Sequence, residues 1–349
     1  MKTMIRGAAA AGLVAALAVL TGCSAGAPSS DTTEAAGGDG AKPVLRVSGV
    51  DPATKELFDE SHIWDDAPYT IEASALRFSD AAAALQSGQI DLGYFAATTA
   101  ILLQANGGQD WTQETAPIVS IAGYAPPRSV GAIIVKSDSG IDSVADLKGK
   151  TITWNAGDNG LWLQALEDAG LTKDDVENVQ SNDSASVFRA GSADALSGAV
   201  SQVADLIADG EAKILVTSGQ EDIAFYPQWA VRRADLDDPD QEALIKDFLV
   251  RYTEWNTKWY WENTDTVRDV LKNVGQQSDA SIDYTLKWQK GVTVIAYDDT
   301  LFKAVQNTVD RFTELGLISG GIKDVSATFD SRYAELLGAT PYSFTDAPV

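Results

Sequence analysis

Residues 78–93, FSDAAAALQSGQIDLG, decide the fold, because the same pattern returns at residues 182–195, NDSASVFRAGSADA. Each stretch reads as a polar capping residue, a short helix, a glycine that ends the helix, and a strand that opens with aspartate. The capping residues are Ser79 and Asn182, and each precedes its glycine by nine positions. A single match of this kind is common, but two in register predict two similarly built α/β lobes.

A second repeated unit places small-residue loops where strands lead into helices. Leu45–Ser48 reads as a strand that stops at Gly49, and Thr151–Trp154 as a strand followed by the loop 155–160. In open α/β sheets such loops line the crevice at the carboxyl ends of the strands, where ligands bind. A helix that begins there offers free N–H groups and a partial positive charge. The sequence therefore predicts a crevice suited to an anion.

Further segments complete the predicted element order. Strands are expected at Pro117–Ile121, Gly131–Val135 and Lys213–Val216. Helices are expected at Thr264–Asn273, Ser278–Gln289, Thr300–Leu315 and Ser326–Leu337. A stripe at helical spacing comprises Leu244, Phe248, Tyr252, Trp255 and Trp259. Such spacing predicts a buried helix face rather than a binding surface.

The N-terminal segment predicts export and tethering. A basic start precedes an apolar run at residues 8–20, and the motif LTGC follows at residues 20–23. This is the pattern of a secretory signal, and LTGC resembles the bacterial lipobox, whose cysteine is lipidated. The apolar run is shorter than the roughly 20 residues that a membrane-spanning helix needs. We expect residues 1–23 to be a lipoprotein signal peptide with lipidation at Cys23; the alternative is an ordinary cleaved signal.

By composition, the remainder of the chain divides into a linker and a folded part. Residues 24–43 are small, polar and Gly-rich, so burial cannot offset their ordering entropy and a flexible linker is expected. The part of the chain that follows is longer than a typical domain with one hydrophobic core. We expect residues 44–135 to form the first part of lobe 1 and residues 136–224 to form lobe 2. Residues 225–349 are expected to return to lobe 1 and to add the C-terminal helices and tail.

The formal net charge of −24 excludes several classes of partner. Nucleic-acid binding depends on neutralisation of phosphates by Lys and Arg, so no nucleic-acid partner is expected. Adhesion to anionic headgroups needs the same residues, which leaves the lipid on Cys23 as the membrane attachment. With a single cysteine there is no intramolecular disulfide and no thiolate metal cage. We expect neither a metal nor a cofactor.

Four motifs together carry a resemblance to a known family. They are ALxxGxIDxG at residues 84–93, DLKGK at 146–150, LxxLxxAGL at 163–171 and GxxDA at 191–195. Their order is similar to that of the solute-binding proteins of ABC importers for sulfonates, taurine and nitrate, over about residues 45–337. The resemblance implies the type II periplasmic-binding-protein fold, with two lobes that are each a mixed sheet flanked by helices. Its members close around a small, usually anionic ligand and deliver it to the transmembrane subunits of a permease.

The resemblance also places the ligand-binding loops of that family on this chain. They fall on Gly49–Pro52, Phe78–Asp80, Phe95–Thr99, Gly157–Trp162, Asn182–Ser184 and Ala199–Gln202. The candidate ligand-binding residues are Ser79, Asp80, Phe95, Thr98, Thr99, Asp158, Asn159, Gly160, Trp162, Asn182 and Ser184.

Several of these residues keep two interpretations. Thr98 and Thr99 either donate hydroxyls to an anion or cap a helix, and Asn159 and Gly160 either cradle the ligand or form a turn. Trp154 and Trp162 are either aromatic walls or packing residues, and Arg128 is either an anion partner or exposed. Asp80 and Asp158 repel an anion unless they point away or the ligand also carries an amine.

We therefore expect an extracytoplasmic, lipid-anchored solute-binding component of an ABC importer that captures a small organic anion, a sulfonate or taurine-like compound. Alternative ligands are an aromatic carboxylate, a nitrate-like ion and a thiamin pyrimidine precursor. The alternative class is an enzyme similar to thiamin-pyrimidine synthase on the same fold; a sensor or adhesin is a third. The one histidine, His62, lies in an acidic stretch, and no nucleophile, metal or phosphate-loop motif is present. No catalytic residue is therefore expected.

Overall fold

The computed structural model of the chain describes residues 42–76, 78–107, 110–155, 160–221, 223–319 and 322–343. The expected signal peptide with Cys23, and the expected linker up to residue 41, lie outside the described residues. Among the residues that are described, no helix has the length and apolarity needed to cross a bilayer.

The first group of strands consists of two sheets joined by a bridge. A parallel pair is formed by β1 (Val44–Ser48) and β2 (Thr70–Ser74). An antiparallel sheet in the order β11-β4-β10-β3 is formed by β3 (Gly93–Ala96), β4 (Ile118–Ala125), β10 (Pro227–Arg232) and β11 (Thr293–Ile295). A parallel bridge between Val47 and Leu92 connects β1 to the residue before β3. Together these strands combine parallel and antiparallel pairing.

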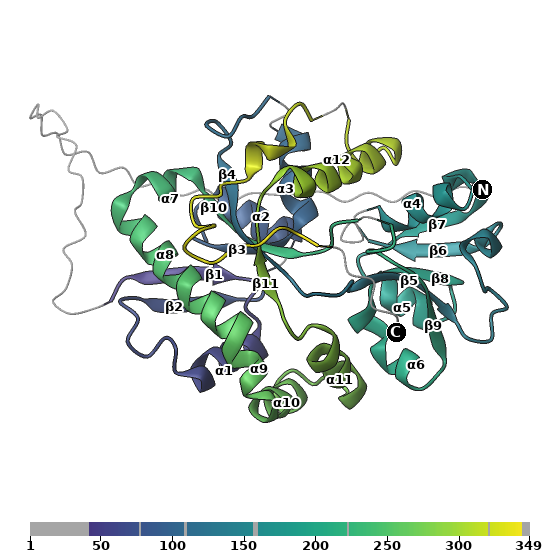
Figure 1. Cartoon of the computed structure of the whole chain (residues 1–349), viewed down its shortest axis with the longest axis horizontal. Coiled ribbons are helices and arrows are strands. Elements are labelled where there is room, and N and C mark those ends of the chain that lie inside the picture. The colour runs from purple at the N-terminus through teal and green to yellow at the C-terminus, as the bar shows by residue number, and fades with distance from the viewer. Residues whose placement is uncertain are drawn as a thin grey trace, which may run out of the picture. The chain divides into compact units, whose positions relative to one another are not determined.

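The second group is a mixed five-stranded sheet in the order β7-β6-β8-β5-β9. Its strands are β5 (Gly131–Lys136), β6 (Thr151–Trp154), β7 (Glu177–Gln180), β8 (Ala195–Ala199) and β9 (Ala212–Thr217). β6 pairs in parallel with β7 and β8, whereas β5 pairs antiparallel with β8 and β9. Figure 1 shows these strands grouped together, with the helices of the same stretch of chain beside them.

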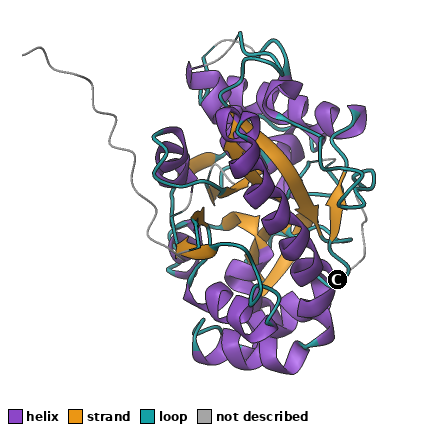
Figure 2. Ribbon diagram, turned by 90° about the vertical axis from the view of Figure 1, so that its left-hand side faces the viewer, coloured by secondary structure: helices purple, strands orange, loops and turns teal. Residues whose placement is uncertain are grey.

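Helices flank both groups of strands, as Figures 1 and 2 show. The helices that follow β1, β2 and β3 are α1 (Pro52–Ser61), α2 (Phe78–Gln86) and α3 (Ala97–Gly107). Those of the five-stranded sheet are η1 (Val144–Leu147), α4 (Leu161–Asp168), η3 (Lys173–Asp175), α5 (Ser184–Arg189), η4 (Val200–Val203) and α6 (Ala204–Ala208). The C-terminal part contains α7 (Arg233–Asp237), α8 (Pro239–Glu254), η5 (Trp255–Trp259), α9 (Tyr260–Glu262), α10 (Thr264–Asn273), α11 (Asp279–Trp288), α12 (Asp299–Glu314) and η6 (Val325–Thr328).

Separate hydrophobic clusters stabilise the two groups of strands. The largest cluster joins β1, β4 and β10 to α1, α8 and α10, with Leu45 and Phe248 fully buried in it. The five-stranded sheet has one cluster that contains Ile133 and another that contains Ile134. Because successive strand residues point to opposite faces, β5 supplies both clusters.

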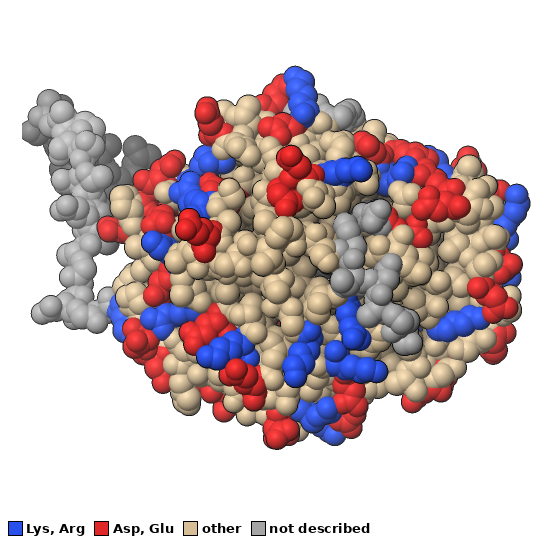
Figure 3. All heavy atoms as spheres, in the orientation of Figure 1, with Lys and Arg blue, Asp and Glu red and all other residues tan. Residues whose placement is uncertain are grey.

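The predicted fold class is confirmed, since mixed sheets flanked by helices form both groups of strands. The helix predicted at Thr264–Asn273 is present with those bounds. In the aromatic stripe, Phe248, Tyr252 and Trp255 are buried as predicted, whereas Leu244 and Trp259 are half-buried. Figure 3 shows acidic and basic side chains interspersed on one face, as expected for a charge excess that is solvated.

The helix predicted at Ser326–Leu337 is wrong. Only η6 (Val325–Thr328) is helical there, and turns follow it. Long-range contacts decide this segment: Phe329 forms a bridge with Ser120 on β4, and the Tyr333 hydroxyl donates to Glu242 at 2.9 Å. Tertiary pairing therefore overrides the helical periodicity.

One strand lies outside the lobe that was predicted for it. Gly131–Val135 was expected in lobe 1, but it forms most of β5 in the five-stranded sheet. The reason is its pairing with β8 and β9, which follow much later in the chain. The wider division into lobes stays a prediction.

Candidate functional site

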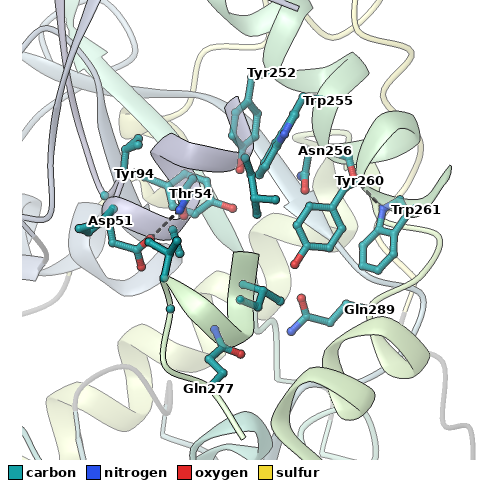
Figure 4. A pocket seen from close by; sticks show the side chains of 18 of the residues that line it. Asp51, Thr54, Tyr94, Tyr252, Trp255, Asn256, Tyr260, Trp261, Gln277 and Gln289 are labelled. Carbon is teal, nitrogen blue, oxygen red and sulfur yellow. Dashed lines mark hydrogen bonds between the residues drawn. The ribbon is translucent and has the colours of Figure 1, made fainter. Parts of the chain in front are cut away.

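A cavity of about 380 Å³ lies between the β1–α1 turn and the C-terminal helices (Figure 4). Its wall combines residues from segments that are far apart in the chain. They are Gly49, Val50, Asp51, Pro52, Ala53, Thr54, Leu57, Tyr94, Trp229, Tyr252, Trp255, Asn256, Tyr260, Trp261, Leu271, Val274, Gly275, Gln277 and Gln289. Small-molecule sites commonly enclose about 300–1,000 Å³, so this cavity has the volume for a small solute.

The turn between β1 and α1 holds Asp51 at the cavity. Gly49 has a φ of 79°, and a Cβ at this position would lie 2.6 Å from the Cβ of Tyr94. Glycine therefore allows both the left-handed backbone and the close approach to β3. Asp51 then caps α1, because its carboxylate accepts a hydrogen bond from the Thr54 N–H at 2.8 Å. Pro52 follows at the first helical position, where its missing N–H is no loss.

A π-helical turn shapes the opposite wall. It is η5 (Trp255–Trp259), and it interrupts the continuous helix that runs from Pro239 to Glu262. A π turn is closed by i→i+5 bonds, so residues five apart lie above one another. The rings of Trp255 and Tyr260 are accordingly 5.4 Å apart, and the Trp261 indole donates to the carbonyl of Asn256 at 2.7 Å. The π turn thus places these four residues at the cavity.

The aromatic rings of the wall form a connected series. Tyr94 lies 4.7 Å from Trp229, and Trp229 lies 5.0 Å from Tyr252, measured between ring centroids. Tyr252 lies 5.5 Å from Trp255. These separations fall in the range of favourable aromatic pairs. The wall is therefore rich in aromatic rings that contact one another.

The polar groups of the aromatic residues in this wall are largely buried. Burial raises the pKa of Tyr94 to about 12, and the hydrogen bond with Tyr252 opposes that shift. Burial also raises the pKa of Tyr260, with a further rise from the negative charge of Asp51. The indole N–H groups of Trp229 and Trp255 have no hydrogen-bond partner among the described residues. Since an unpaired buried donor is costly, a solute that offers an acceptor would gain free energy by pairing with it.

None of the eight predicted ligand-binding residues whose side chains the structure describes lines this cavity. Asp158 and Asn159 lie outside the described residues, as does the side chain of Ser79. Asp80 is exposed in the first turn of α2. Phe95 is buried in the cluster around α2 and β3. Their role as ligand contacts stays a prediction.

Thr98 and Thr99 lie in the first turn of α3, where both are buried. Trp162 is fully buried, with its ring 5.6 Å from that of Trp154 in the core of the five-stranded sheet. Gly160 precedes α4 with a φ of 81°, in contact with Arg311 of α12. The buried surroundings of Trp154 and Trp162 therefore fit their interpretation as packing residues.

Both predicted capping residues are wrong. Ser79 is the second residue of α2 rather than the residue before it. Asn182 is exposed, and Asp183 caps α5 instead, because its carboxylate accepts from the Ser186 N–H at 3.3 Å. Ser184 is buried and hydrogen-bonds to the Asn155 side chain at 3.2 Å, which connects two of the predicted loops.

The remaining candidates from the sequence lie elsewhere. The Arg128 guanidinium stacks on the ring of Trp288 at 5.0 Å. His62 is exposed at the end of α1, with its Nδ1 3.1 Å from the Asp65 carboxylate. No group of three or more His, Cys, Asp or Glu side chains in the described part of the chain is placed to hold a metal ion.

The sequence reasoning missed most of the cavity wall. Among the described residues of the predicted ligand-binding loops, only those of Gly49–Pro52 lie in it. A usable signal is the run WNTKWYW at residues 255–261, because its three consecutive aromatic residues cannot share one face of an α-helix. At least one of these three aromatic residues therefore had to point away from the buried face of the helix.

Comparisons with known proteins bear on this fold. Residues 73–228 match the family model described as NMT1/THI5 like. The chain is similar to the periplasmic aliphatic sulphonate binding protein SsuA from Escherichia coli, at 20% identity and a TM-score of 0.69, over 88% of this chain and 95% of that chain. It is also similar to the alkanesulfonate-binding protein SsuA from Xanthomonas axonopodis pv. citri bound to MOPS, at 19% identity and a TM-score of 0.69, over 83% and 99%.

The desulfurization enzyme DSZB shares the fold at 16% identity and a TM-score of 0.56, over 84% of this chain and 98% of that chain. A search of curated protein sequences finds no match. The chain thus resembles periplasmic sulfonate-binding proteins in fold, as predicted, and the fold is that of periplasmic binding proteins.

Proposed function

We propose, from the NMT1/THI5-like match and the periplasmic-binding-protein fold, that this chain is the extracytoplasmic solute-binding component of an ABC importer. The observation that carries the proposal is the cavity of about 380 Å³ with its aromatic wall. It joins the β1–α1 turn, β3, β10 and the C-terminal helices, so one solute would contact elements from both ends of the chain. Transmembrane permease subunits are the proposed partners.

The proposed solute is a small sulfonate or taurine-like compound. Support comes from the fold shared with two sulfonate-binding proteins, one of them bound to MOPS, which carries a sulfonate and an amine. We propose that the predicted loops, with Thr98, Thr99, Gly160, Asn182 and Ser184, add contacts when the two lobes close. A ligand shifts such an equilibrium only through differential contact with its two states. Small-angle scattering would then give a smaller radius of gyration with saturating taurine.

A thermal-shift panel tests the solute class. The panel comprises taurine, ethanesulfonate, benzoate, nitrate and an aminopyrimidine, which covers the alternative ligands. A ligand at about 100 times its dissociation constant adds roughly 2.7 kcal/mol to stability. A shift with a sulfonate and none with the other classes supports the proposal. A shift with benzoate, nitrate or the aminopyrimidine alone would replace the sulfonate by that class.

We also propose that Cys23 is lipidated and holds the protein at the extracytoplasmic face of the cell membrane. The support is the LTGC motif after a short apolar run. Membrane fractionation of cells that express Cys23→Ala tests this. Release of the variant, or its accumulation unprocessed, is expected; a processed variant that stays with the membranes like the unmodified chain contradicts the anchor.

Catalysis is the weaker candidate, although a desulfurization enzyme shares the fold. The described residues that line the cavity include no Cys, His, Lys or Arg, and Asp51 is their one carboxylate. Asp51 already caps α1, and His62 lies exposed outside the cavity wall. We therefore propose binding rather than turnover.

A further inference from the structure

The helix α11 has apolar side chains on two opposite faces. Ile282 and Leu286 lie on one face and pack in the largest cluster, with residues of β1, β4 and β10. Tyr284 packs against the cluster that contains Ile134, where α11 contacts η4 and α6. Since two successive residues of an α-helix turn it by about 200°, Tyr284 lies on the face opposite Ile282. α11 therefore contacts the cores of both groups of strands.

The two ends of α11 line the aromatic cavity. Gln277 comes just before the capping residue Ser278, and Gln289 is the residue at which the helix ends. Figure 4 shows both glutamine side chains among those that surround the cavity. A glutamine amide donates and accepts hydrogen bonds, so each of these side chains can bind a polar group. A solute in the cavity would therefore meet α11 at its ends.

The last turn of α11 also contacts the connection between β4 and β5. The ring of Trp288 stacks on that of Tyr284, with centroids 5.7 Å apart, and the Arg128 guanidinium lies over the Trp288 ring at 5.0 Å. A Cβ at Gly291 would lie 3.4 Å from the Pro127 side chain. This connection leads from the antiparallel sheet into the five-stranded sheet. α11 thus contacts a segment through which the two groups of strands are joined.

We propose that α11 couples the aromatic cavity to the five-stranded sheet: a solute fixes the ends of the helix, and its Tyr284 face transmits that constraint to η4, α6 and the β4–β5 connection. The inference rests on the proposed function, because it concerns regulation of the same site. A packed interface responds as a unit rather than deforming continuously. η4 also overlaps Ala199–Gln202, one of the predicted ligand-binding loops. Closure of the lobes therefore depends on α11 as well as on direct contacts with the solute.

Tyr284 is a positioning residue in this scheme, since it is not among the described residues that line the cavity. Its hydroxyl is buried and has no hydrogen-bond partner in the described part of the chain. Tyr284→Phe therefore keeps the packing and loses no bond, whereas Tyr284→Ala removes the ring from between α11 and the five-stranded sheet. The matched control is Phe302→Ala, which removes another half-buried ring, packed in the cluster around α12.

Amide hydrogen exchange of the intact chain without solute gives the first test. Tyr284→Ala should raise exchange rates by about 10-fold or more in α6 and also in the cavity segment Leu271–Gln277, because α11 supports both. Tyr284→Phe and Phe302→Ala should leave both segments within about twofold of the unmodified chain. An unchanged rate at Leu271–Gln277 in Tyr284→Ala would overturn the inference, because α11 would then serve packing alone.

A second variant covers the case in which Tyr284→Ala does not fold. Arg128→Gln removes the charge above the Trp288 ring without opening a core, since Arg128 is only half-buried. Exchange should rise in the same two segments, by about 3-fold. Unchanged exchange at Leu271–Gln277 would again overturn the inference.

Exchange with saturating taurine tests the coupling in the opposite direction. Taurine should slow exchange in α6 by about 5-fold or more, although no described residue of α6 lines the cavity. At saturation, Gln289→Ala should abolish this slowing while exchange at Gly49–Thr54 is still slowed. Equal slowing of α6 in Gln289→Ala and in the unmodified chain would contradict the proposed route through α11.

Calorimetry and small-angle scattering complete the test. Tyr284→Ala should bind taurine about 5-fold or more weakly, because the solute then has to order α11. The fall in radius of gyration at saturation should also be smaller than in the unmodified chain or in Tyr284→Phe. An unchanged affinity together with an unchanged fall would overturn the inference.

Failure of the proposed function would appear differently. If taurine does not bind the unmodified chain, the sulfonate assignment is wrong, and the exchange comparison without solute still decides the role of α11. Loss of the importer function would appear as unchanged uptake in cells that lack the protein.

Discussion

The turn between β1 and α1 and the turn between β6 and α4 follow the same sequence pattern, yet they lie in different surroundings. At the first, Asp51 caps α1 and lines a cavity. At the second, Gly160 precedes α4 and touches Arg311, whose guanidinium bonds to Gln164 at 2.9 Å and to Glu167 at 2.7 Å. A strand that leads into a helix thus predicts a turn, and what packs over the turn decides whether a cavity lies there.

The aromatic residues beside the two turns differ in the same way. The rings of Trp162 and Trp154 are tilted against each other within a core of the five-stranded sheet. The rings of Trp255 and Tyr260 meet edge to face, and the π turn places them at the cavity. Neighbouring ring pairs therefore fill a core in one region and line a cavity in the other.

The largest effect is expected from Trp162→Ala. Because Trp162 is fully buried among aliphatic and aromatic neighbours, its truncation leaves a void and should lower the free energy of unfolding by about 3–5 kcal/mol. Chemical denaturation measures this value. A loss below about 1 kcal/mol would mean that the ring is not packed, and would reopen its interpretation as a ligand wall.

Alanine substitutions at two glycines measure how closely α12 packs over the turn between β6 and α4. Gly160 and Gly170 both have positive φ, 81° and 74°, but a Cβ at Gly160 would lie 2.8 Å from the Cβ of Arg311, whereas Gly170 has open space. Gly170→Ala should cost about 1–2 kcal/mol from backbone strain alone. Gly160→Ala should cost about 1–3 kcal/mol more, because of the added overpacking. Equal losses of stability in thermal melts would show that α12 does not press on this turn.

The pH dependence of stability tests the burial of the cavity wall. The pKa of Tyr94 is about 12 in the folded chain, above the ordinary value of about 10 in the unfolded chain. Stability from this group is complete below pH ~10 and is lost as the pH rises toward 12, by up to ~1.4 kcal/mol per pH unit. In that pH window, the free energy of unfolding of Tyr94→Phe should fall less steeply with rising pH than that of the unmodified chain. An unchanged slope would indicate a solvated hydroxyl.

The smallest effect separates the two residues at the start of α5. Asp183→Ala removes the observed cap and should cost about 1 kcal/mol. Asn182→Ala changes an exposed side chain and should stay within about 0.5 kcal/mol of the unmodified chain. Melting both variants under one condition compares them directly, and the reverse order would restore Asn182 as the cap.

The fold could be predicted from local signals where those signals decide the structure. The helix Thr264–Asn273 was predicted with its bounds, because periodicity and composition agree there. The place of β5 could not be predicted, because its partners Ala195–Ala199 and Ala212–Thr217 are distant in sequence. The helix expected at Ser326–Leu337 is absent for the same reason, because this segment contacts distant Ser120 and Glu242.

The cavity was less predictable than the fold. Tyr94, Trp229 and Tyr252 converge from three distant segments, and no local spacing relates them. Tyr252 and Trp255 were correctly assigned to a buried face, but burial in a core and exposure to an internal cavity give the same spacing in sequence. The strand that stops at Gly49 and the family resemblance both pointed to Gly49–Pro52.

The central claim is that the solute occupies the cavity beside Asp51, and a crystal structure of the chain grown with taurine tests it most directly. The account predicts density for taurine within the aromatic wall, beside the rings of Trp255 and Tyr260. Taurine bound elsewhere, with the cavity holding only solvent, would contradict the account.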